Sequence, residues 1–244
     1  MKPLFLAVGL LAALGVSAAE KAPAAAQAPV VAKASAPEKG FVLQEVRVGK
    51  TAFKFPIPKG FLAVGREEAW AKAFHERMEN LAQDPRKGVS FIFTYLTPEH
   101  FAHCREVQAL DTGLDCWGTV QNQTADREVD LAGFAKIADA VAAEFGKNGF
   151  DGIRKLVRRE VKDEEFNQAL GNLGNPLVVE RNERSMQFIM PTGGSKLILG
   201  GFVLVEGKLF NIYLQRPKTE AREMMVMMDD WVAEIIKTTK ATRK

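Results

Sequence analysis

Apolar and polar residues follow their clearest pattern in the last third of the chain, where four short runs predict β-strands. Turn sequences such as Glu206-Gly207 separate these runs, and connections this short require antiparallel neighbours. A stripe of apolar residues at helical spacing follows, from Thr219 to Lys237. The predicted strands are Leu177–Glu180, Ser185–Met190, Lys196–Val205 and Leu209–Gln215.

The first part of the domain predicts a hairpin, a helix and a covered strand. Two β-patterned runs, Phe41–Val48 and Thr51–Ile57, form the hairpin. We expect Pro56 and Pro58 to stop its second strand because proline donates no ladder hydrogen bond. The next apolar run, VSFIFTYLT, is apolar on both faces, which predicts a central strand covered on both sides. Between them, residues at helical spacing predict a helix. They are Trp70, Phe74, Met78 and Leu81.

The middle of the chain has one clear helix and two irregular stretches. Asp130 is expected to cap a helical stripe that extends to Phe145. The stretch Pro98–Cys116 has the least regular pattern, a further strand is expected at Cys116–Val120, and Ile153–Val161 fits a helix and an edge strand equally. Together these elements predict the α+β class, with an antiparallel sheet flanked by helices in a single domain over residues 40–240.

The N-terminus has the pattern of an export signal. A cationic start is followed by an apolar run from Leu4 to Val16 and by the small residues Ser17-Ala18-Ala19. As a helix this run would span about 20 Å, less than the roughly 30 Å of a bilayer core, so we expect cleavage and no remaining transmembrane segment. No cysteine follows to accept a lipid. The sequence thus predicts a signal peptide over residues 1–19 and a periplasmic or secreted protein.

Residues 20–39 have the composition of a tether. Alanine, proline and lysine dominate this segment, which cannot bury enough apolar surface to offset the entropy of ordering it. We therefore expect a disordered linker, of a kind typical of exported bacterial proteins. The formal net charge of the chain is only +3, with acidic and basic residues interleaved, and this is not the strongly basic balance of a nucleic-acid-binding protein.

Cys104 and Cys116 are the two cysteines of the chain. In an oxidising compartment the default state of an isolated pair is a disulfide. The loop between them is short and easily closed, and the bond would stabilise the fold by about 3 kcal/mol. The pair is therefore predicted to be bonded.

The same region holds the strongest candidate for metal chemistry. His100 and His103 could share one helix face, and Cys104 with Cys116 could complete a zinc or copper site. Such a site needs reduced thiolates and so competes with the disulfide, and a metal-binding protein or an enzyme using this region is the alternative function. Methionines of the last helix could also bind copper(I), although their spacing favours core packing. They are Met224, Met225, Met227 and Met228.

A basic run before Asp163 could bind an anion or an acidic partner. On a helix its side chains would align at four-residue steps, but the acidic residues that follow favour a neutralised, solvated face equally. No serine lies in a Gly-x-Ser-x-Gly elbow, and paired acids such as Asp229-Asp230 fall on polar helix faces. We therefore predict no catalytic residue and no cofactor. The candidate surface residues are Arg154, Arg158, Arg159 and Lys162.

Two segments carry a resemblance to a known family. The hairpin ending FKFPIPKGF, and the strands GGFVLVEGKLFNIYL leading into a helix with DDWVAEII, are similar to the PsbP-like group of exported α/β/α sandwich proteins. The resemblance extends over most of residues 41–237. It implies a sandwich fold and an accessory or binding role without established catalytic machinery, and it offers no catalytic residue to carry over. The predicted function is a non-enzymatic exported protein that binds an unknown protein or envelope partner.

Overall fold

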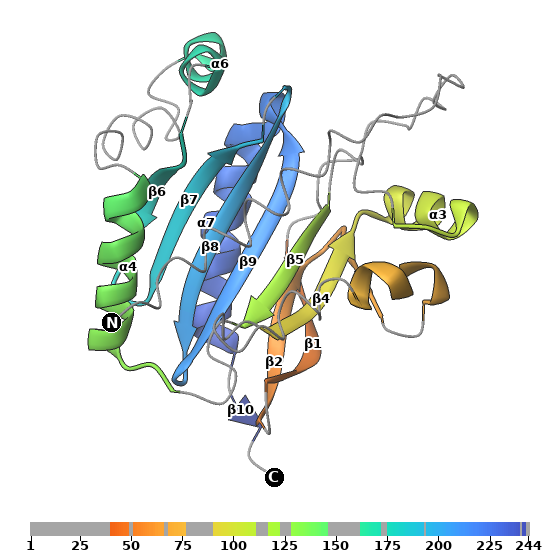
Figure 1. Cartoon of the computed structure of the whole chain (residues 1–244), viewed down its shortest axis with the longest axis horizontal. Helices are drawn as coiled ribbons and strands as arrows, with labels where there is room; N and C mark the ends of the chain where they lie inside the picture. The colour runs from red at the N-terminus through yellow and green to blue at the C-terminus, as the bar shows by residue number, and fades with distance from the viewer. Residues whose placement is uncertain are drawn as a thin grey trace.

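The computed structural model describes residues 40–48, 51–65, 68–76, 90–110, 117–122, 128–145, 162–171, 175–192, 194–239 and 241–242. Within these residues the strands form two antiparallel sheets with helices beside them (Figure 1). The first sheet has the strand order β1-β2-β10, and the second has seven strands in the order β3-β4-β5-β9-β8-β7-β6. The strands are β1 (Phe41–Val48), β2 (Thr51–Pro58), β3 (Leu62–Val64), β4 (Ser90–Leu96), β5 (Trp117–Asn122), β6 (Leu177–Arg181), β7 (Ser185–Pro191), β8 (Lys196–Val205), β9 (Lys208–Pro217) and β10 (Ala241–Thr242).

Four longer helices accompany the sheets in the described part of the chain. None of them is long and apolar enough to cross a membrane. The predicted signal peptide and linker, residues 1–39, lie outside the described residues. The helices are α3 (Pro98–Val107), α4 (Leu131–Phe145), α6 (Asp163–Gly171) and α7 (Ala221–Thr238), with short 3-10 turns η2 (Ala69–Ala71) and η3 (Lys218–Glu220).

The C-terminal half of the large sheet is the predicted meander. Strands β6, β7, β8 and β9 pair with their sequence neighbours in antiparallel register, and the β8–β9 ladder runs without a break from Lys196↔Pro217 to Val205↔Lys208. Strand β5 then pairs with β9, although almost the whole of the middle of the chain separates them. This long-range pairing joins the two halves of the sheet.

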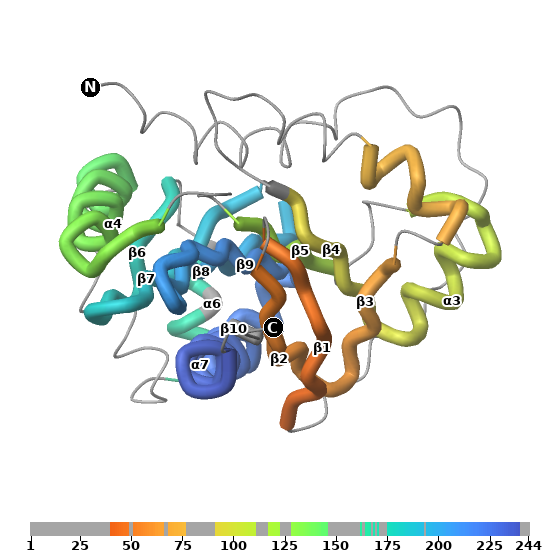
Figure 2. The backbone as a smooth tube through the Cα atoms, turned by 90° about the horizontal axis from the view of Figure 1, so that it is seen from below, coloured from red at the N-terminus to blue at the C-terminus, as the bar shows by residue number. Residues whose placement is uncertain are grey.

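Helices cover both faces of the large sheet, which confirms the predicted α+β class with a helix-flanked antiparallel sheet. Figure 2 shows α4 on one side of the sheet and α7, together with the β1–β2 hairpin, on the other. Under α4 lies a core that includes Phe134, Phe188 and Phe202. On the opposite side, Phe55, Phe210 and other residues of both sheets pack with α7.

Helix α7 shows how the sequence stripe becomes a core contact. Its predicted apolar residues are buried at three- and four-residue spacing, as the helical period requires. Trp231 is fully buried, and its Nε1–H donates to the carbonyl oxygen of Pro56 at 2.6 Å, so α7 is joined to strand β2. The buried methionines fill this core, in agreement with the packing prediction. They are Met224, Met225 and Met228.

Gly118 allows the two halves of the large sheet to pack closely. A Cβ at this position would lie well inside van der Waals contact with the Tyr95 ring and the Tyr213 carbonyl oxygen. Without it, the Tyr95 ring reaches across β5, and its hydroxyl donates to the carbonyl oxygen of Tyr213. The side chain from β4 is thereby fixed to the backbone of β9.

The structure corrects the prediction for the stretch Pro98–Cys116. Pro98–Val107 is the helix α3, which begins after Thr97, whose hydroxyl oxygen accepts a hydrogen bond from the backbone N–H of His100 at 3.3 Å. Proline in the first turn fits a helix start because its missing N–H is not needed there. The helix buries His100 and Cys104 in place of purely apolar residues, which hid its periodicity.

Strand β2 ends at Pro58, one of the two prolines expected to stop it, but it continues through Pro56. Strand β10 pairs with β2 only at Ala52 and Phe53, so in the described residues the edge beside Pro56 has no partner strand that would need an N–H. Helix α6 and the short strands β3 and β10 had no expected counterpart in the sequence pattern.

Candidate functional site

The candidate metal and disulfide residues lie on or next to α3. His100 and Cys104 are buried on one face of this helix, one turn apart, while His103 is half-buried. Cys116 lies outside the described residues, so the disulfide with Cys104 stays a prediction. In the part of the chain that the structure describes, no group of three or more His, Cys, Asp or Glu side chains is placed to hold a metal ion.

The candidate basic surface is mostly outside the described residues. This applies to Arg154, Arg158 and Arg159, whereas Lys162 is described and lies exposed just before α6. The idea of an anion or partner surface there remains a prediction.

A different site emerges where the turn between β6 and β7 meets α7. A cavity of about 480 Å³ lies between them, which we call the acidic groove. The residues that line it come from two segments far apart in the sequence. They are Glu180, Asn182, Glu183, Arg184, Ser185, Gln187, Asp229, Val232, Ala233 and Ile236.

Hydrogen bonds shape the strand side of the acidic groove. The backbone N–H of Asn182 donates to the carbonyl oxygen of Ser185 at 2.8 Å and closes the tight turn. The Asn182 amide also lies 3.4 Å from both Glu180 Oε1 and Ser185 Oγ. Across the groove, Gln187 Nε2 donates to Asp229 Oδ1 at 2.8 Å. This last bond ties β7 to α7 and holds one carboxylate in place.

The lining of the acidic groove combines negative charge with an apolar wall. The lining includes three carboxylate residues and one guanidinium residue, Arg184. Helix α7 contributes the apolar wall, where Val232 is buried and Ile236 is 36% exposed. The lining contains no histidine or cysteine, and its one serine, Ser185, is fully buried in β7. Such a surface can bind a cationic group with an aliphatic stem, because the stem covers apolar area while the charge meets carboxylates.

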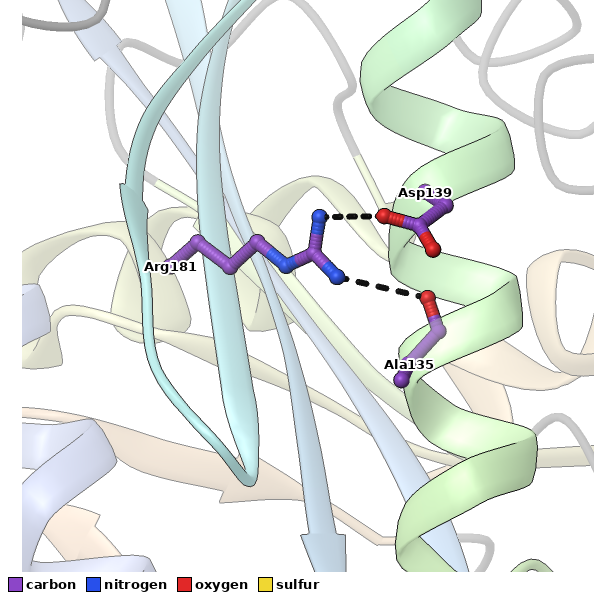
Figure 3. A network of polar contacts seen from close by, with 3 residues as sticks. All are labelled: Ala135, Asp139 and Arg181. Atoms are coloured by element: carbon purple, nitrogen blue, oxygen red, sulfur yellow. Dashed lines mark hydrogen bonds and ion pairs between the residues drawn. The ribbon is translucent and has the colours of Figure 1, made fainter.

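A polar network on the other side of β6 holds this edge of the sheet against α4. Arg181 Nη1 lies 2.7 Å from Asp139 Oδ1, and Arg181 Nη2 donates to the carbonyl oxygen of Ala135 at 3.4 Å (Figure 3). The Asp139 side chain is largely exposed, so the pair contributes little to stability by itself. Its effect is to orient the strand from which the acidic groove starts.

Two further cavities are smaller and have less defined chemistry. One of about 370 Å³ lies at the start of α4, beside Asp130 and Gly207. Asp130 there accepts a hydrogen bond from the Gly133 N–H at 2.7 Å, so it serves as the predicted helix cap. The other, of about 320 Å³, lies between β1 and β4 beside the buried His75.

Sequence reasoning did not find the acidic groove. Asp229 was placed on a polar helix face, and it is indeed exposed, but its contact with Gln187 joins residues 42 positions apart. No local motif marks such a pair. The only usable signal would have been the cluster of charges in the β6–β7 turn.

Comparisons with known proteins give a weak likeness in fold. No family model matches the chain, and no curated protein matches it. A solved structure that it resembles is the solution structure of cyanobacterial PsbP (CyanoP) from Synechocystis sp. PCC 6803, at 12% identity over 78% of this chain and 86% of that chain, with a TM-score of 0.31. The match is to the group that the sequence motifs resemble. It concerns the fold alone, and no argument about function is taken from it.

Proposed function

We propose that this chain is an exported, periplasmic binding or accessory protein without enzymatic activity, which docks a basic segment of a partner protein in the acidic groove. The observation that carries the proposal is the groove lining, where three carboxylates stand beside an apolar helix wall. The export signal and tether read from the sequence support the location, and the absence of a nucleophile–base pair among the lining residues supports a binding role.

The charge balance of the acidic groove defines the partner. Glu180, Glu183 and Asp229 exceed the positive charge of Arg184, so a lysine or arginine side chain is attracted and an acidic one is repelled. Each exposed ion pair contributes on the order of 0.2–1 kcal/mol, so several contacts are needed for stable binding. Contact of aliphatic stems with Val232 and Ile236 adds apolar burial.

A binding assay with matched peptides tests the proposal. The probe is the fluorescent peptide Lys-Leu-Lys-Leu-Lys, and the control peptide carries Glu in place of each Lys. We expect saturable binding of the basic peptide that weakens as salt is raised, and no binding of the acidic one. Fluorescence anisotropy with the full chain measures the binding of each peptide and its dependence on salt.

Two variants one residue apart distinguish binding in the acidic groove from a general effect of the protein's net charge. Asp229→Lys reverses a charge in the lining, while Asp230→Lys makes the same change on the exposed side of α7, outside the lining. We expect only Asp229→Lys to weaken peptide binding, and Glu183→Lys, which breaks no bond to Gln187, to weaken it as well. Equal effects of Asp229→Lys and Asp230→Lys would show that the groove does not bind the peptide.

A further inference from the structure

A cavity of about 320 Å³ lies beside strand β1, which is an edge strand of the three-stranded sheet in the described residues. We call it the edge cavity. Its volume falls within the range of about 300–1,000 Å³ that is usual for ligand pockets. The edge cavity lies at the β3–β4 end of the large sheet, whereas the acidic groove begins at β6, the strand at the opposite end. The two sites are therefore separate.

The backbone edge of β1 borders the edge cavity. Four consecutive residues of this strand, 44–47, line it. Because successive residues of a strand point to opposite faces, a cavity lined by four in a row lies along the edge of the strand and not over one face. The other edge of β1 pairs with β2 along the whole strand, from Phe41↔Pro58 to Val48↔Thr51. A segment bound in the edge cavity would therefore lie beside the backbone of β1.

Strand β4 forms the opposite wall of the edge cavity, at the point where β3 stops covering it. Strand β3 pairs with β4 from Leu62↔Leu96 to Val64↔Thr94. The cavity begins where this pairing ends, since its lining includes Val64 and residues 91–93 of β4. The register of β4 against β5 shifts within the same three residues. The edge cavity thus lies between a strand of the small sheet and a strand of the large one.

The inner and outer sides of the edge cavity differ in chemistry. On the inner side, Val46 and Phe93 are 4% and 6% exposed and belong to the same apolar core. On the outer side, Glu45 and Arg47 are exposed at alternate positions of β1, and their charges cancel. The lining therefore favours an apolar side chain that points inward, next to an uncharged polar side chain that points outward. An extended strand places its side chains in this alternation.

Strand β1 is also apolar and exposed next to the edge cavity. Val42 and Leu43 are 58% and 52% exposed, and as neighbours they point to opposite faces of the strand. An edge strand that exposes apolar residues is a template for pairing with another chain. Recognition by strand addition uses such an edge, because main-chain hydrogen bonds supply affinity and pockets for alternate side chains supply specificity. Strand β1 offers the edge, and the edge cavity offers the pocket.

We propose that β1 binds an extended segment of a partner protein by strand addition, with an apolar side chain of that segment in the edge cavity. The segment alternates apolar and uncharged polar residues, and its backbone bonds to residues 44–47 of β1. The inference does not depend on the acidic groove, because a segment of this composition carries no positive charge for the carboxylates of the groove to attract.

Two peptides and the histidine side chains of the full chain test the proposal. The probe is Glu-Thr-Phe-Thr-Val-Thr-Glu, whose terminal acids keep it soluble and out of the acidic groove, and the control, Glu-Thr-Thr-Phe-Val-Thr-Glu, has the same residues without the alternation. The ring of His75 lines the edge cavity and lies 5.4 Å from the Phe91 ring between centroids, whereas His100 and His103 are on α3. In an assigned ¹H–¹³C spectrum the probe should shift only the His75 signal, and the control should bind at least tenfold more weakly.

Backbone methylation of the probe distinguishes strand addition from apolar contact alone. Alternate residues of a strand direct their N–H and C=O groups to the same edge. Methylation of the three threonine nitrogens therefore blocks one edge of the probe, and methylation of the phenylalanine and valine nitrogens blocks the other. Only one of these two peptides should lose affinity, by about tenfold or more, because β1 bonds to a single edge.

A pair of variants places the bound probe in the edge cavity. Gln44→Trp fills the cavity with an indole ring and should weaken binding, while Leu43→Trp adds the same ring one residue earlier, outside the lining, and should not. The methylated probes decide the question on the parent chain if Gln44→Trp fails to fold. The proposal is overturned if the probe leaves His75 unshifted or shifts all three histidines alike, if the two methylated probes bind equally, or if the control binds as well as the probe. A dimer of the free chain that the probe dissociates would also overturn it, because a second copy would then be the occupant of β1.

Discussion

Replacement of Trp231 by phenylalanine tests how α7 is held on the fold. The Trp231 ring is fully buried and contacts the Tyr95 ring edge-on at 5.3 Å between centroids, with an interplanar angle of 82°. Its Nε1–H is bonded to the Pro56 carbonyl oxygen at 2.6 Å. Phenylalanine fits inside the same space, so Trp231→Phe removes this bond and part of the ring without adding bulk.

The expected loss of stability follows from two contributions. The Pro56 carbonyl oxygen loses its buried donor, which costs about 1–3 kcal/mol. The smaller ring gives up about 40 Å² of buried apolar surface, or about 1 kcal/mol, and leaves a small cavity. Trp231→Phe should therefore lower the free energy of unfolding by about 3 kcal/mol, measured by urea denaturation followed by circular dichroism.

Trp70→Phe is the matched control for this prediction. The Trp70 indole also donates a hydrogen bond at 2.6 Å, but the acceptor is Glu68, two residues away and only partly buried. Water can solvate that carboxylate when the indole is lost. We therefore expect Trp70→Phe to lower the free energy of unfolding by about 1 kcal/mol, mainly because less apolar surface is buried. If Trp231→Phe cost no more than Trp70→Phe, the bond from α7 to β2 would not carry the stability assigned to it.

Three further predictions concern ionisation, cysteine and the N-terminus. Tyr213 is buried and its pKa is raised above the ordinary value of 10.0, so unfolding releases its proton at alkaline pH. Stability should fall as pH rises above about 10, less steeply in Tyr213→Phe, and identical pH profiles of the melting temperature would contradict this. Denatured, unreduced protein should show no free thiol if Cys104 and Cys116 are bonded, whereas two titratable thiols would exclude the disulfide. Protein sequencing of exported material should find a mature N-terminus at Ala19 or Glu20, and deletion of residues 20–39 should leave the melting temperature unchanged within a few degrees.

The elements that the sequence predicts well are those whose determinants are local. The meander from β6 to β9 is connected by short turns, so strand identity and pairing follow from neighbouring residues. Helices α4 and α7 each bury one regular stripe, and Asp130 caps the first of them as expected. For these parts, periodicity and turn chemistry agree with the tertiary structure.

Helix α3 was missed because its core contacts are not conventionally apolar. Its start signals, Thr97 followed by Pro98, were present in the sequence. Its buried face, however, consists of His100 and Cys104, residues that were considered for chemistry and not for packing. A capping sequence is thus a better guide than hydrophobicity where polar residues form the buried face of a helix.

The acidic groove and the pairing of β5 with β9 could not be predicted because both depend on contacts between distant segments. The groove needs Gln187 and Asp229 to meet, and the large sheet needs β5 to lie beside β9, with Gln121 opposite Asn211. Nothing near these residues in the sequence specifies their partners. Strand pairing at long range is set by the packing of the whole domain.

The covered sheet gives polar strand residues a different meaning from the one they usually have. In an antiparallel sheet with one solvated face, polar residues at alternate positions mark that face. Here Thr119 and Gln121 alternate with Val120 on β5, yet all three are buried, because this strand lies inside a sheet with covered faces. Burial of a polar residue costs free energy unless it is bonded. Alternation of polar and apolar residues along a strand therefore marks a solvated face only where the sheet leaves that face uncovered, and β5 lies where both faces are covered.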